Sequence, residues 1–466
     1  MNTQGFVEAD EIRTRFSRAM SDMYKQEVPL YGTLMALVAE TNSTVMASDK
    51  AVYDHLQRTG EIERLDMERH GAIRVGTPEE LATIARLFAV MGMQPVGYYD
   101  LTPAGVPVHS TAFRAIHEDS LQASPFRVFT SLLRLDLIEN EEIRQRVQAI
   151  LDQRQIFTPD ALKLIEKFET NGGLDAKDAA DFVEQALETF RWHHDATVTA
   201  KDYQRLHDQH RLIADVVAFK GPHINHLTPR TLDIDMIQNG MQQKGITPKA
   251  VIEGPPRRRC SILLRQTSFK ALQETVAFTD QDGIATGSHT ARFGEIEQRG
   301  AALTPKGREL YDSLLNAARA ELGEFPSESN AEKYTAILEK HFKDFPDDYA
   351  ELHDKGLAYF RYFPTPKGIA SRSNSHRPSS RQELIAQGHI QYEPLVYEDF
   401  LPVSAAGIFQ SNLGDDSQAH YAGSSNQAEF EKALGQKVTN ELKLYADTQR
   451  RSLLDCSTIL AVSPLV

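Results

Sequence analysis

The sequence predicts an α+β fold, in which strand–helix–strand modules build a central β-sheet and many added helices surround it. Two observations lead to this prediction. Apolar and β-branched runs alternate with a helical pattern in two similar stretches, and long segments of purely helical pattern flank and separate them. We expect one catalytic domain over residues 1–466, made of N-terminal helices (1–66), a first module (67–139), a helical insertion (140–210), a second module (211–303), and a helical and loop region that completes the site (304–466).

The composition excludes several classes of protein. The chain is 41% hydrophobic and 25% charged, which is typical of a globular protein. Its net charge of -14 repels phosphate backbones, so we expect no nucleic-acid partner. No run of 18 apolar residues occurs, so we expect no membrane span. Cys260 and Cys456 lie far apart without a metal-type spacing, and residues 1–18 are polar, which together predict a cytoplasmic location.

The N-terminal part is predicted to be helical, and the first module follows it. Apolar residues recur at helical spacing over about 8–26, and further helix is expected around 34–38 and over 51–59. In the module, Thr77 and Pro78 predict a helix start, because threonine is a good N-cap and proline suits the first helical position. Strands are expected on either side of this helix and after it, at 69–76, 94–101, 106–113 and 126–137.

Residues 140–199 return to a helical pattern, and the second module begins after them. Residues 212–218 are apolar and β-branched, and a short apolar run with two histidines comes next. Thr228 and Pro229 predict a second helix start, for a helix that ends near 244–245. Strands are expected after it at 249–253 and 260–266, with a glycine-rich turn at 283–287.

The two modules share a repeated sequence pattern that includes a histidine. A buried histidine that only hydrogen-bonds a neighbour is the more frequent case, and His223 keeps that interpretation. Each module, however, has a histidine before a Thr-Pro helix start and then a Gly-Met pair, at 92–93 and 240–241. The repeat therefore predicts that His70 and His226 occupy equivalent positions of a pseudo-symmetric sheet.

Two carboxylates follow on a predicted strand at 293–299. Glu295 and Glu297 share one face of this strand, because side chains alternate along a strand. Burying both without a cation would be costly, so the face is either solvated or binds a positive partner such as a metal. With His70 and His226, one of these carboxylates would complete a 2-His-1-carboxylate triad, which holds Fe(II) on three positions and leaves others open.

The C-terminal region is predicted from simpler signals. Thr304 and Pro305 predict a helix start, and residues 324–354 have a charged helical pattern. Residues 364–381 are rich in proline, serine and arginine, which is typical of a loop. At 398–413, small residues and a glycine inside an apolar run would let the backbone pass close to a ligand.

Four motifs in this order resemble the 2-oxoadipate dioxygenase/decarboxylase family of the vicinal oxygen chelate superfamily: His70-Gly-Ala-Ile-Arg74, His226-Leu-Thr-Pro-Arg-Thr, Phe293-Gly-Glu-Ile-Glu-Gln-Arg299 and Phe400-Leu-Pro-Val-Ser-Ala-Ala-Gly407. The resemblance spans nearly the whole chain. It implies a vicinal-oxygen-chelate-like central sheet, and Fe(II) held by His70, His226 and a glutamate that we assign to Glu295, with Glu297 as the alternative. It also implies substrate contacts by His70 and His226, a carboxylate clamp at Arg74, and a backbone contact near Val403.

The resemblance implies a reaction as well as a site. The expected enzyme converts 2-oxoadipate and O2 to D-2-hydroxyglutarate and CO2 by intramolecular decarboxylation and hydroxylation, in lysine catabolism. Its partners would be a 2-oxo acid and O2, and the oligomeric state stays open. Two alternatives are another metal-dependent enzyme of the superfamily, such as an isomerase or a ring-cleaving dioxygenase, and a non-catalytic sensor of 2-oxo acids.

Overall fold

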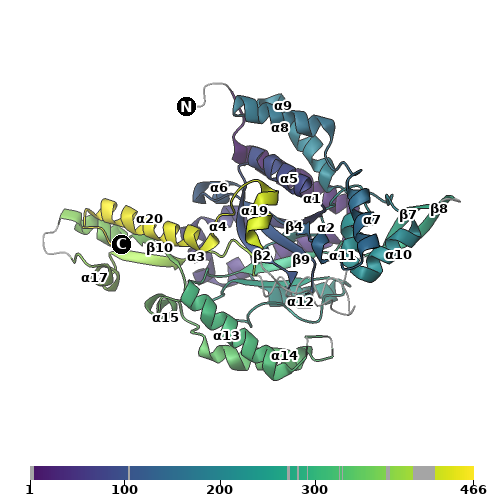
Figure 1. Ribbon diagram of the computed structural model, residues 1–466. Coiled ribbons are helices and arrows are strands. Elements are labelled where there is room, and N and C mark those ends of the chain that lie inside the picture. Colours follow the sequence, from purple (N-terminus) through teal and green to yellow (C-terminus); the bar gives the residue numbers. More distant parts are fainter. Residues whose placement is uncertain are drawn as a thin grey trace.

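The computed structural model describes residues 5–102, 105–269, 273–280, 283–290, 292–324, 326–327, 329–373, 378–401 and 426–466. Its elements confirm a mixed α+β fold, with a five-stranded sheet in the middle of the molecule and helices on all sides of it (Figure 1). In the described residues, no helix is long and apolar enough to cross a membrane.

The strands fall into one larger sheet and three pairs. The larger sheet has the order β2-β3-β4-β1-β5, and the pairs are β6–β9, β7–β8 and β10–β11. Their bounds are β1 Arg69–Val75, β2 Gln94–Asp100, β3 Val108–Arg114, β4 Phe126–Leu133, β5 Leu227–Pro229, β6 Leu264–Ser268, β7 Glu274–Asp280, β8 Gly283–His289, β9 Glu295–Arg299, β10 Phe360–Pro364 and β11 Ile390–Pro394.

The helices form several groups around these strands. Before and within the first module lie α1 (Ala9–Glu27), α2 (Pro29–Ser48), α3 (Lys50–Thr59), α4 (Glu61–Leu65), α5 (Pro78–Val90) and α6 (Glu118–Ala123). The insertion and second module contain α7 (Glu141–Leu151), α8 (Pro159–Asn171), α9 (Ala176–Leu187), α10 (Ala200–Gln209), α11 (Arg211–Val217) and α12 (Ile234–Gln243). The remainder has α13 (Pro305–Leu322), α14 (Ala331–His341), α15 (Tyr349–Asp354), α16 (Pro366–Ala370), α17 (Arg381–Ala386), α19 (Gln427–Leu434) and α20 (Glu441–Leu460).

Strand β1 is the centre of the larger sheet. It pairs in parallel with β4, so that His70 lies opposite Arg127. On its other side it pairs antiparallel with β5, and His70 lies opposite Thr228. All seven residues of β1 are buried, as expected for a strand covered on both faces. The two strand sequences that carry the predicted histidines are therefore direct neighbours.

The β6–β9 pair continues the larger sheet beyond β5. Arg230, just after β5, bridges to Glu297 of β9 in parallel, and the N–H of Thr231 donates to the carbonyl of Glu297 at 2.7 Å. In each module the first strand is followed by a helix, β1–α5 or β5–α12, and the last strand, β4 or β9, returns to lie beside the first.

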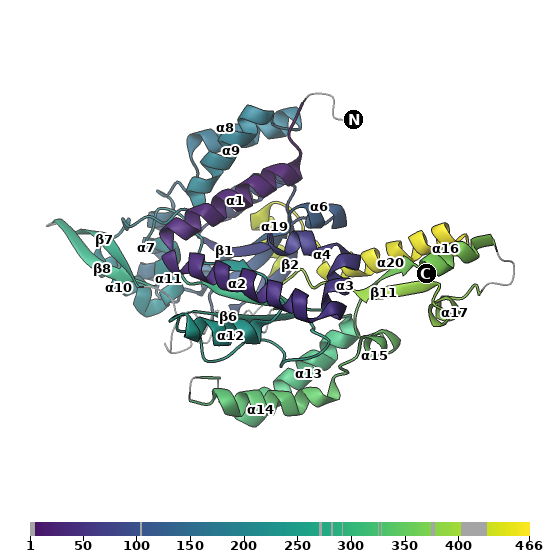
Figure 2. The same ribbon diagram turned by 180° about the vertical axis from the view of Figure 1, so that it is seen from behind.

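Alternation along the strands sorts the side chains between two cores. Ile73, Leu227 and Ile296 belong to the core that also contains apolar residues of α1, α2 and α5. Figure 2 shows α1 and α2 running across this side of the sheet. Ala72 belongs to the second core, on the opposite face, and residues 70 and 74 alternate with Ile73 onto that same face. His70 and Arg74 of β1 therefore lie on the face opposite Ile73, and Glu295 and Glu297 of β9 lie on the face opposite Ile296.

Most elements expected from the sequence are present. The predicted helices at 8–26, 51–59 and from Thr77-Pro78 correspond to α1, α3 and α5, and the strands at 69–76 and 94–101 correspond to β1 and β2. Thr304 caps α13, as predicted, by accepting a hydrogen bond from the N–H of Gly307.

Three local predictions in the second module were wrong. Residues 227–229 form β5 rather than a helix start, and α12 begins five residues after Pro229, capped by Asp233. Residues 249–253 form no regular strand and contact the β6 segment only at their ends, through Lys249 and Glu253, while 283–287 belongs to β8 rather than to a turn. Pairing with existing strands decided these segments, because local signals are weak against tertiary contacts. The apolar run at 212–218 lies in α11.

The outer elements project from this centre. The β7–β8 hairpin points away on one side, next to α10, and α20 lies along β10 at the opposite side (Figures 1 and 2). Helices α13 and α14 pack on each other below the sheet in Figure 1.

Gly71 is predicted to be essential for the spacing of β1 and β5. A Cβ on Gly71 would meet the side chain of Ile224 at 2.3 Å and the carbonyl of His226 at 3.1 Å. We expect Gly71→Ala to lower the free energy of unfolding by about 1–3 kcal/mol, because the added methyl pushes the histidine-bearing segments apart. Denaturant unfolding checks this, with Gly32→Ala as the control, since nothing lies within 4 Å of a Cβ at Gly32. Equal stability of both variants would contradict the close approach.

Candidate metal centre

Three buried side chains converge on the polar face of the sheet. His70 comes from β1, His226 immediately precedes β5, and Glu295 begins β9. Oε1 of Glu295 lies 3.1 Å from Nε2 of His70 and 3.6 Å from Nε2 of His226. Ligand atoms at about 2.1 Å from one ion, at right angles to each other, would lie about 3 Å apart. The three predicted residues are thus brought together at a separation that suits one metal ion.

The chemistry of these donors also calls for a cation between them. Nδ1 of His70 lies 2.9 Å from Oε2 of Glu297, and Nε2 of His70 lies 3.1 Å from Oε1 of Glu295, so a carboxylate faces each nitrogen of this ring. Burial lowers the pKa of His226 to about 4, so this imidazole is neutral near pH 7. The lone pair of a neutral imidazole nitrogen and those of a carboxylate oxygen repel one another unless a positive charge lies between them.

The pKa shifts of the other two residues point the same way. Burial works against a charged His70, but Glu297 and Glu295 more than offset it and raise the pKa of His70. Burial alone would raise the pKa of Glu295, yet the two histidines lower it. Glu295 therefore stays ionised, and the cluster favours a positive charge at its centre.

Two neutral side chains orient Glu295. The hydroxyl of Thr228 donates to its Oε1 at 3.0 Å, and the amide of Gln266 donates to the same atom at 2.9 Å. The alternation of β5 turns Thr228 to the same face as His226, and the pairing of β6 with β9 brings Gln266 alongside. The sequence reasoning missed both, since each role depends on strand register rather than on a local motif.

Glu297 has a different environment from Glu295, although both lie on one face of β9. Arg299 donates to both of its oxygens, at 2.7 and 2.9 Å, and Arg127 lies 3.8 Å from Oε1. Despite burial, these guanidinium groups and His70 hold the pKa of Glu297 at about 2. Glu297 is therefore engaged as an anion by arginines and orients His70, whereas Glu295 faces the two histidines.

Aromatic rings enclose the imidazoles. The ring of Phe293 packs on His226 with 4.9 Å between centroids, and the ring edge of Phe400 packs on His70, also at 4.9 Å. Both phenylalanines are almost fully buried. They limit access of water to the imidazole faces, which strengthens electrostatic interactions inside the cluster.

Arg74 lies on the same face as His70, as the strand period predicts. Its charge contributes to the low pKa of His226, so the guanidinium is within electrostatic reach of the triad. Nη1 of Arg74 donates to Oδ2 of Asp215 at 2.7 Å. The predicted contact at Val403 lies outside the described residues.

A layer of buried ion pairs supports the cluster from one side. Glu68 accepts from Arg127 at 2.7 Å and from Arg230 at 3.1 Å. Glu398 accepts two hydrogen bonds from Arg64, at 2.9 and 3.0 Å, and a further one from Arg127. Because every one of these groups is buried, each charge needs its partners in place.

The same layer holds the segment that carries Phe400. Both oxygens of Asp399 accept from Arg114, at 2.6 and 2.9 Å, and the hydroxyl of Tyr445 donates to Asp399 at 2.5 Å. Arg299 also donates to the carbonyl of Tyr397 at 2.7 Å. The segment after β11 is thus held against the sheet by cations of β3 and β9.

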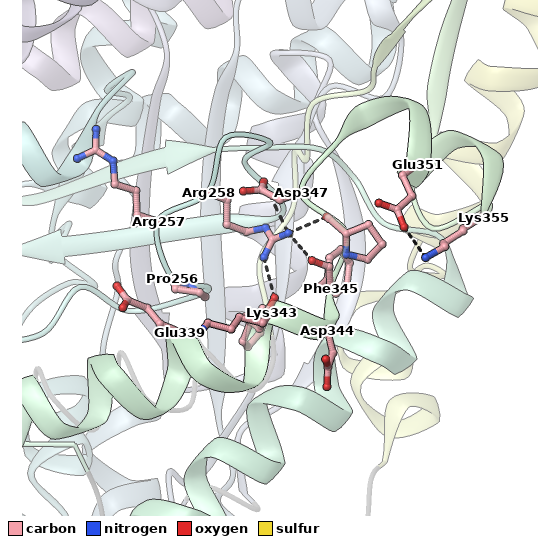
Figure 3. A pocket seen from close by; sticks show the side chains of 12 residues that line it. Pro256, Arg257, Arg258, Glu339, Lys343, Asp344, Phe345, Asp347, Glu351 and Lys355 are labelled. Carbon is pink, nitrogen blue, oxygen red and sulfur yellow. Dashed lines mark hydrogen bonds and ion pairs between the residues drawn. The ribbon is translucent and has the colours of Figure 1, made fainter.

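A surface pocket lies away from the triad. It measures about 530 Å³ and is lined by residues 256–258 and by side chains from 339 to 355, none of which belongs to the triad (Figure 3). Its buried cation, Arg258, donates to the backbone carbonyls of Phe342, Phe345 and Pro346. That guanidinium therefore supports a loop, and we assign no ligand to this pocket.

Similarity to known proteins covers the whole chain. A family model described as 2-oxoadipate dioxygenase/decarboxylase matches residues 16–412. A protein of that description from Pseudomonas putida (strain KT2440) is 69% identical over 460 residues, 99% of this chain and 99% of that protein. One from Escherichia coli (strain K12) is 55% identical over 453 residues, 97% of this chain and 99% of that protein.

Solved structures match equally well. The crystal structure of the hydroxyglutarate synthase from Pseudomonas putida matches with a TM-score of 0.91 at 65% identity, over 99% of this chain and 100% of that chain. The crystal structure of that synthase in complex with 2-oxoadipate matches with a TM-score of 0.92 at 66% identity, over the same shares of both chains.

The contrast between the two glutamates gives a prediction for metal binding. We expect Glu295→Gln, His70→Ala and His226→Ala each to lose at least nine-tenths of the bound metal, because each removes one of three donors. Glu297→Gln is expected to keep most of the metal but to bind it about 10–100-fold more weakly, since it only orients His70.

Metal analysis of the anaerobically purified variants, followed by titration with Fe(II), checks this. Full metal content in Glu295→Gln together with loss in Glu297→Gln would reverse the two assignments. Circular dichroism of each variant serves as the control for folding.

Proposed function

Because the chain belongs to the 2-oxoadipate dioxygenase/decarboxylase family, we propose that it is an Fe(II)-dependent enzyme that converts 2-oxoadipate and O2 to D-2-hydroxyglutarate and CO2. Dioxygenation and decarboxylation of 2-oxoadipate is the activity of this family, and the similarity extends over the full length of the chain. The single structural observation that supports the proposal is the convergence of His70, His226 and Glu295 on one buried point.

The donor set favours iron among the common metals. Two imidazoles and one carboxylate on one side of an ion are the arrangement used by non-haem Fe(II) oxygenases, whereas no cysteine belongs to the cluster. When bound, Fe(II) would supply the redox chemistry with O2 and open positions for a 2-oxo acid. His70, His226 and Glu295 would hold it.

The surrounding residues would keep these donors in their ligating form. Glu297 would take the Nδ1 proton of His70 as a hydrogen-bond acceptor and so leave Nε2 free to ligate. Thr228 and Gln266 would fix the orientation of Glu295. Phe293 and Phe400 would exclude water from the faces of the imidazoles.

Arg74 is proposed to bind a carboxylate of the substrate. A guanidinium presents several N–H donors in one plane, which match the two oxygens of a carboxylate. 2-Oxoadipate carries a carboxylate beside its 2-oxo group and a second one at the far end of the chain. We assign the far carboxylate to Arg74, which leaves the other for the metal. The backbone near Val403 stays a prediction for a further substrate contact.

The overall reaction balances with O2 as the only co-reactant. The bond between the first carboxylate and the 2-oxo carbon breaks, and that carboxylate leaves as CO2. One atom of O2 enters the former 2-oxo carbon, which becomes the new carboxylate, and the other becomes the hydroxyl on the adjacent carbon. One substrate molecule is therefore both decarboxylated and hydroxylated, and no second 2-oxo acid is consumed.

The topology supports a vicinal-oxygen-chelate-like sheet, which is part of this proposal. In both modules a helix follows the first strand, and the last strand lies beside the first. The first strands of the two modules, β1 and β5, are antiparallel neighbours, and they bring the two histidines to one centre. A cytoplasmic location stays a prediction, and both cysteines are free and buried.

The proposed reaction predicts a fixed stoichiometry. With Fe(II) and 2-oxoadipate, we expect one CO2 released and one 2-hydroxyglutarate formed for each O2 consumed, without added 2-oxoglutarate. An oxygen electrode, CO2 trapping and chiral chromatography of the product check this. Turnover without O2 uptake would favour an isomerase, and binding of 2-oxoadipate without any product would favour a sensor.

Arg74 gives a second prediction. We expect Arg74→Ala to keep its iron but to raise the KM for 2-oxoadipate about 10–100-fold, because a charge-assisted contact worth about 1.5–3 kcal/mol is lost. Arg74→Lys should recover part of the loss, since lysine keeps the charge but not the planar fork. Steady-state kinetics at saturating O2 measure both, and an unchanged KM in Arg74→Ala would remove the clamp role.

A further inference from the structure

A second buried cluster lies next to Arg74, and the proposed reaction does not use it. Its members are Asp215 of α11, His223 of the segment before β5, and His289 at the end of β8. Oδ1 of Asp215 lies 2.9 Å from Nε2 of His289 and 3.3 Å from Nε2 of His223. Both histidines therefore face Asp215 rather than the imidazoles of the triad.

The two oxygens of Asp215 have separate partners. Oδ1 faces the two histidines, whereas Oδ2 accepts the hydrogen bond from Nη1 of Arg74. All four residues are more than nine-tenths buried. Burial alone would raise the pKa of Asp215, but Arg74 and then His223 hold it well below its usual range. Asp215 is therefore an anion and is the counter-charge of Arg74.

A chain of hydrogen bonds fixes the position of Asp215. The hydroxyl of Tyr203 lies 2.7 Å from Nδ1 of His289. Burial raises the pKa of Tyr203 to about 12, so its hydroxyl keeps the proton and donates it to Nδ1. With Nδ1 accepting from Tyr203, Nε2 of His289 donates to Oδ1 of Asp215 at 2.9 Å. The order is Tyr203 to His289 to Asp215, which in turn accepts from Arg74.

The geometry of this cluster would also suit a metal ion, but its charge does not. In the triad, Glu295 meets two imidazoles, a hydroxyl and an amide, so a bound cation would supply the positive charge. In the second cluster, the guanidinium of Arg74 already supplies that charge at 2.7 Å from Asp215. A divalent ion would lie close to Arg74 and would be repelled by it.

We propose that Asp215, held by His289, is a positioning residue that fixes the guanidinium of Arg74 for binding the far carboxylate of the substrate. This inference rests on the proposed function, in which Arg74 binds that carboxylate. A long arginine side chain has many rotamers, and a fixed partner removes them before the substrate arrives. A guanidinium has enough N–H donors to serve Asp215 and a substrate carboxylate at once.

Asp215 also keeps Arg74 away from the triad. Arg74 and Glu295 lie on the same face of the sheet, and an unanchored guanidinium would be drawn toward that carboxylate. An arginine paired with Glu295 would compete with the metal ion for the same oxygens. The second cluster therefore separates the cation that binds substrate from the anion that binds metal.

Asp215→Asn is the variant that tests the inference, because it keeps the shape of the side chain and removes its charge. We expect the KM for 2-oxoadipate to rise at least tenfold, kcat to change less than threefold, and the iron content to stay at the wild-type level. In Arg74→Ala, the additional change Asp215→Asn should raise KM no further. A 2-oxo acid without the far carboxylate, such as 2-oxohexanoate, should show the same KM with wild type and Asp215→Asn.

The matched control is Glu80→Gln, which breaks another buried carboxylate–arginine pair, with Arg154 at 2.7 Å. It should lower Tm without raising KM. If Asp215→Asn does not fold, Tyr203→Phe and His289→Gln test the same chain of hydrogen bonds through smaller rises in KM. Additive effects of Arg74→Ala and Asp215→Asn, or an unchanged KM in all three variants, would overturn the inference.

Two other results keep the inference distinct from alternatives. Two metal ions per wild-type chain, falling to one in Asp215→Asn, would make the cluster a second metal site and overturn the positioning role. Absence of turnover in the wild type would instead refute the proposed function. In that case, calorimetry measures the affinity for 2-oxoadipate directly. The positioning role of Asp215 is refuted if Asp215→Asn binds 2-oxoadipate as tightly as wild type does.

Discussion

The ion pair between Glu297 and Arg299 is the interaction on which the site depends. It holds one carboxylate of β9 ionised inside the protein, and that carboxylate in turn orients His70. Arg299 also reaches the backbone of the segment that carries Phe400. Removing either charge would leave the other buried without its closest partner, and breaking a buried ion pair typically costs about 3–5 kcal/mol. The pair thus links the histidine, the sheet and one wall of the site.

The two glutamates of β9 show how neighbours give identical side chains different tasks. Glu297 lies among arginines and is neutralised by the protein itself. Two residues earlier, Glu295 meets histidines, a threonine and an amide, which orient it but bring no fixed full positive charge. A separation of two residues along the strand is enough to place Glu297 beside the arginines and Glu295 beside the two histidines. Asp215, like Glu297, is neutralised by an arginine, in this case Arg74.

Much of this arrangement could be predicted from the sequence, because it follows from strict alternation. His70 and Arg74 share a face of β1, and Glu295 and Glu297 share a face of β9, as expected. The helix start at Thr77-Pro78 was also correct. The helix start predicted at Thr228-Pro229 was wrong, because these residues pair with β1 and the hydroxyl of Thr228 donates to Glu295. Gln266 and Asp215 were not foreseen, since their roles depend on residues that are distant in the sequence.

The separation of ionic partners along the chain has a consequence for biosynthesis. Arg64 meets Glu398 across 334 positions, Arg114 meets Asp399 across 285, and Arg127 meets Glu398 across 271. Until the ribosome has added residue 399 of the 466, these arginines have no acidic partner from the 398–399 pair. The interior around β1, β3 and β4 therefore cannot exclude water fully until that pair has been made. Final consolidation of this interior must be a late event, after most of the chain has been made.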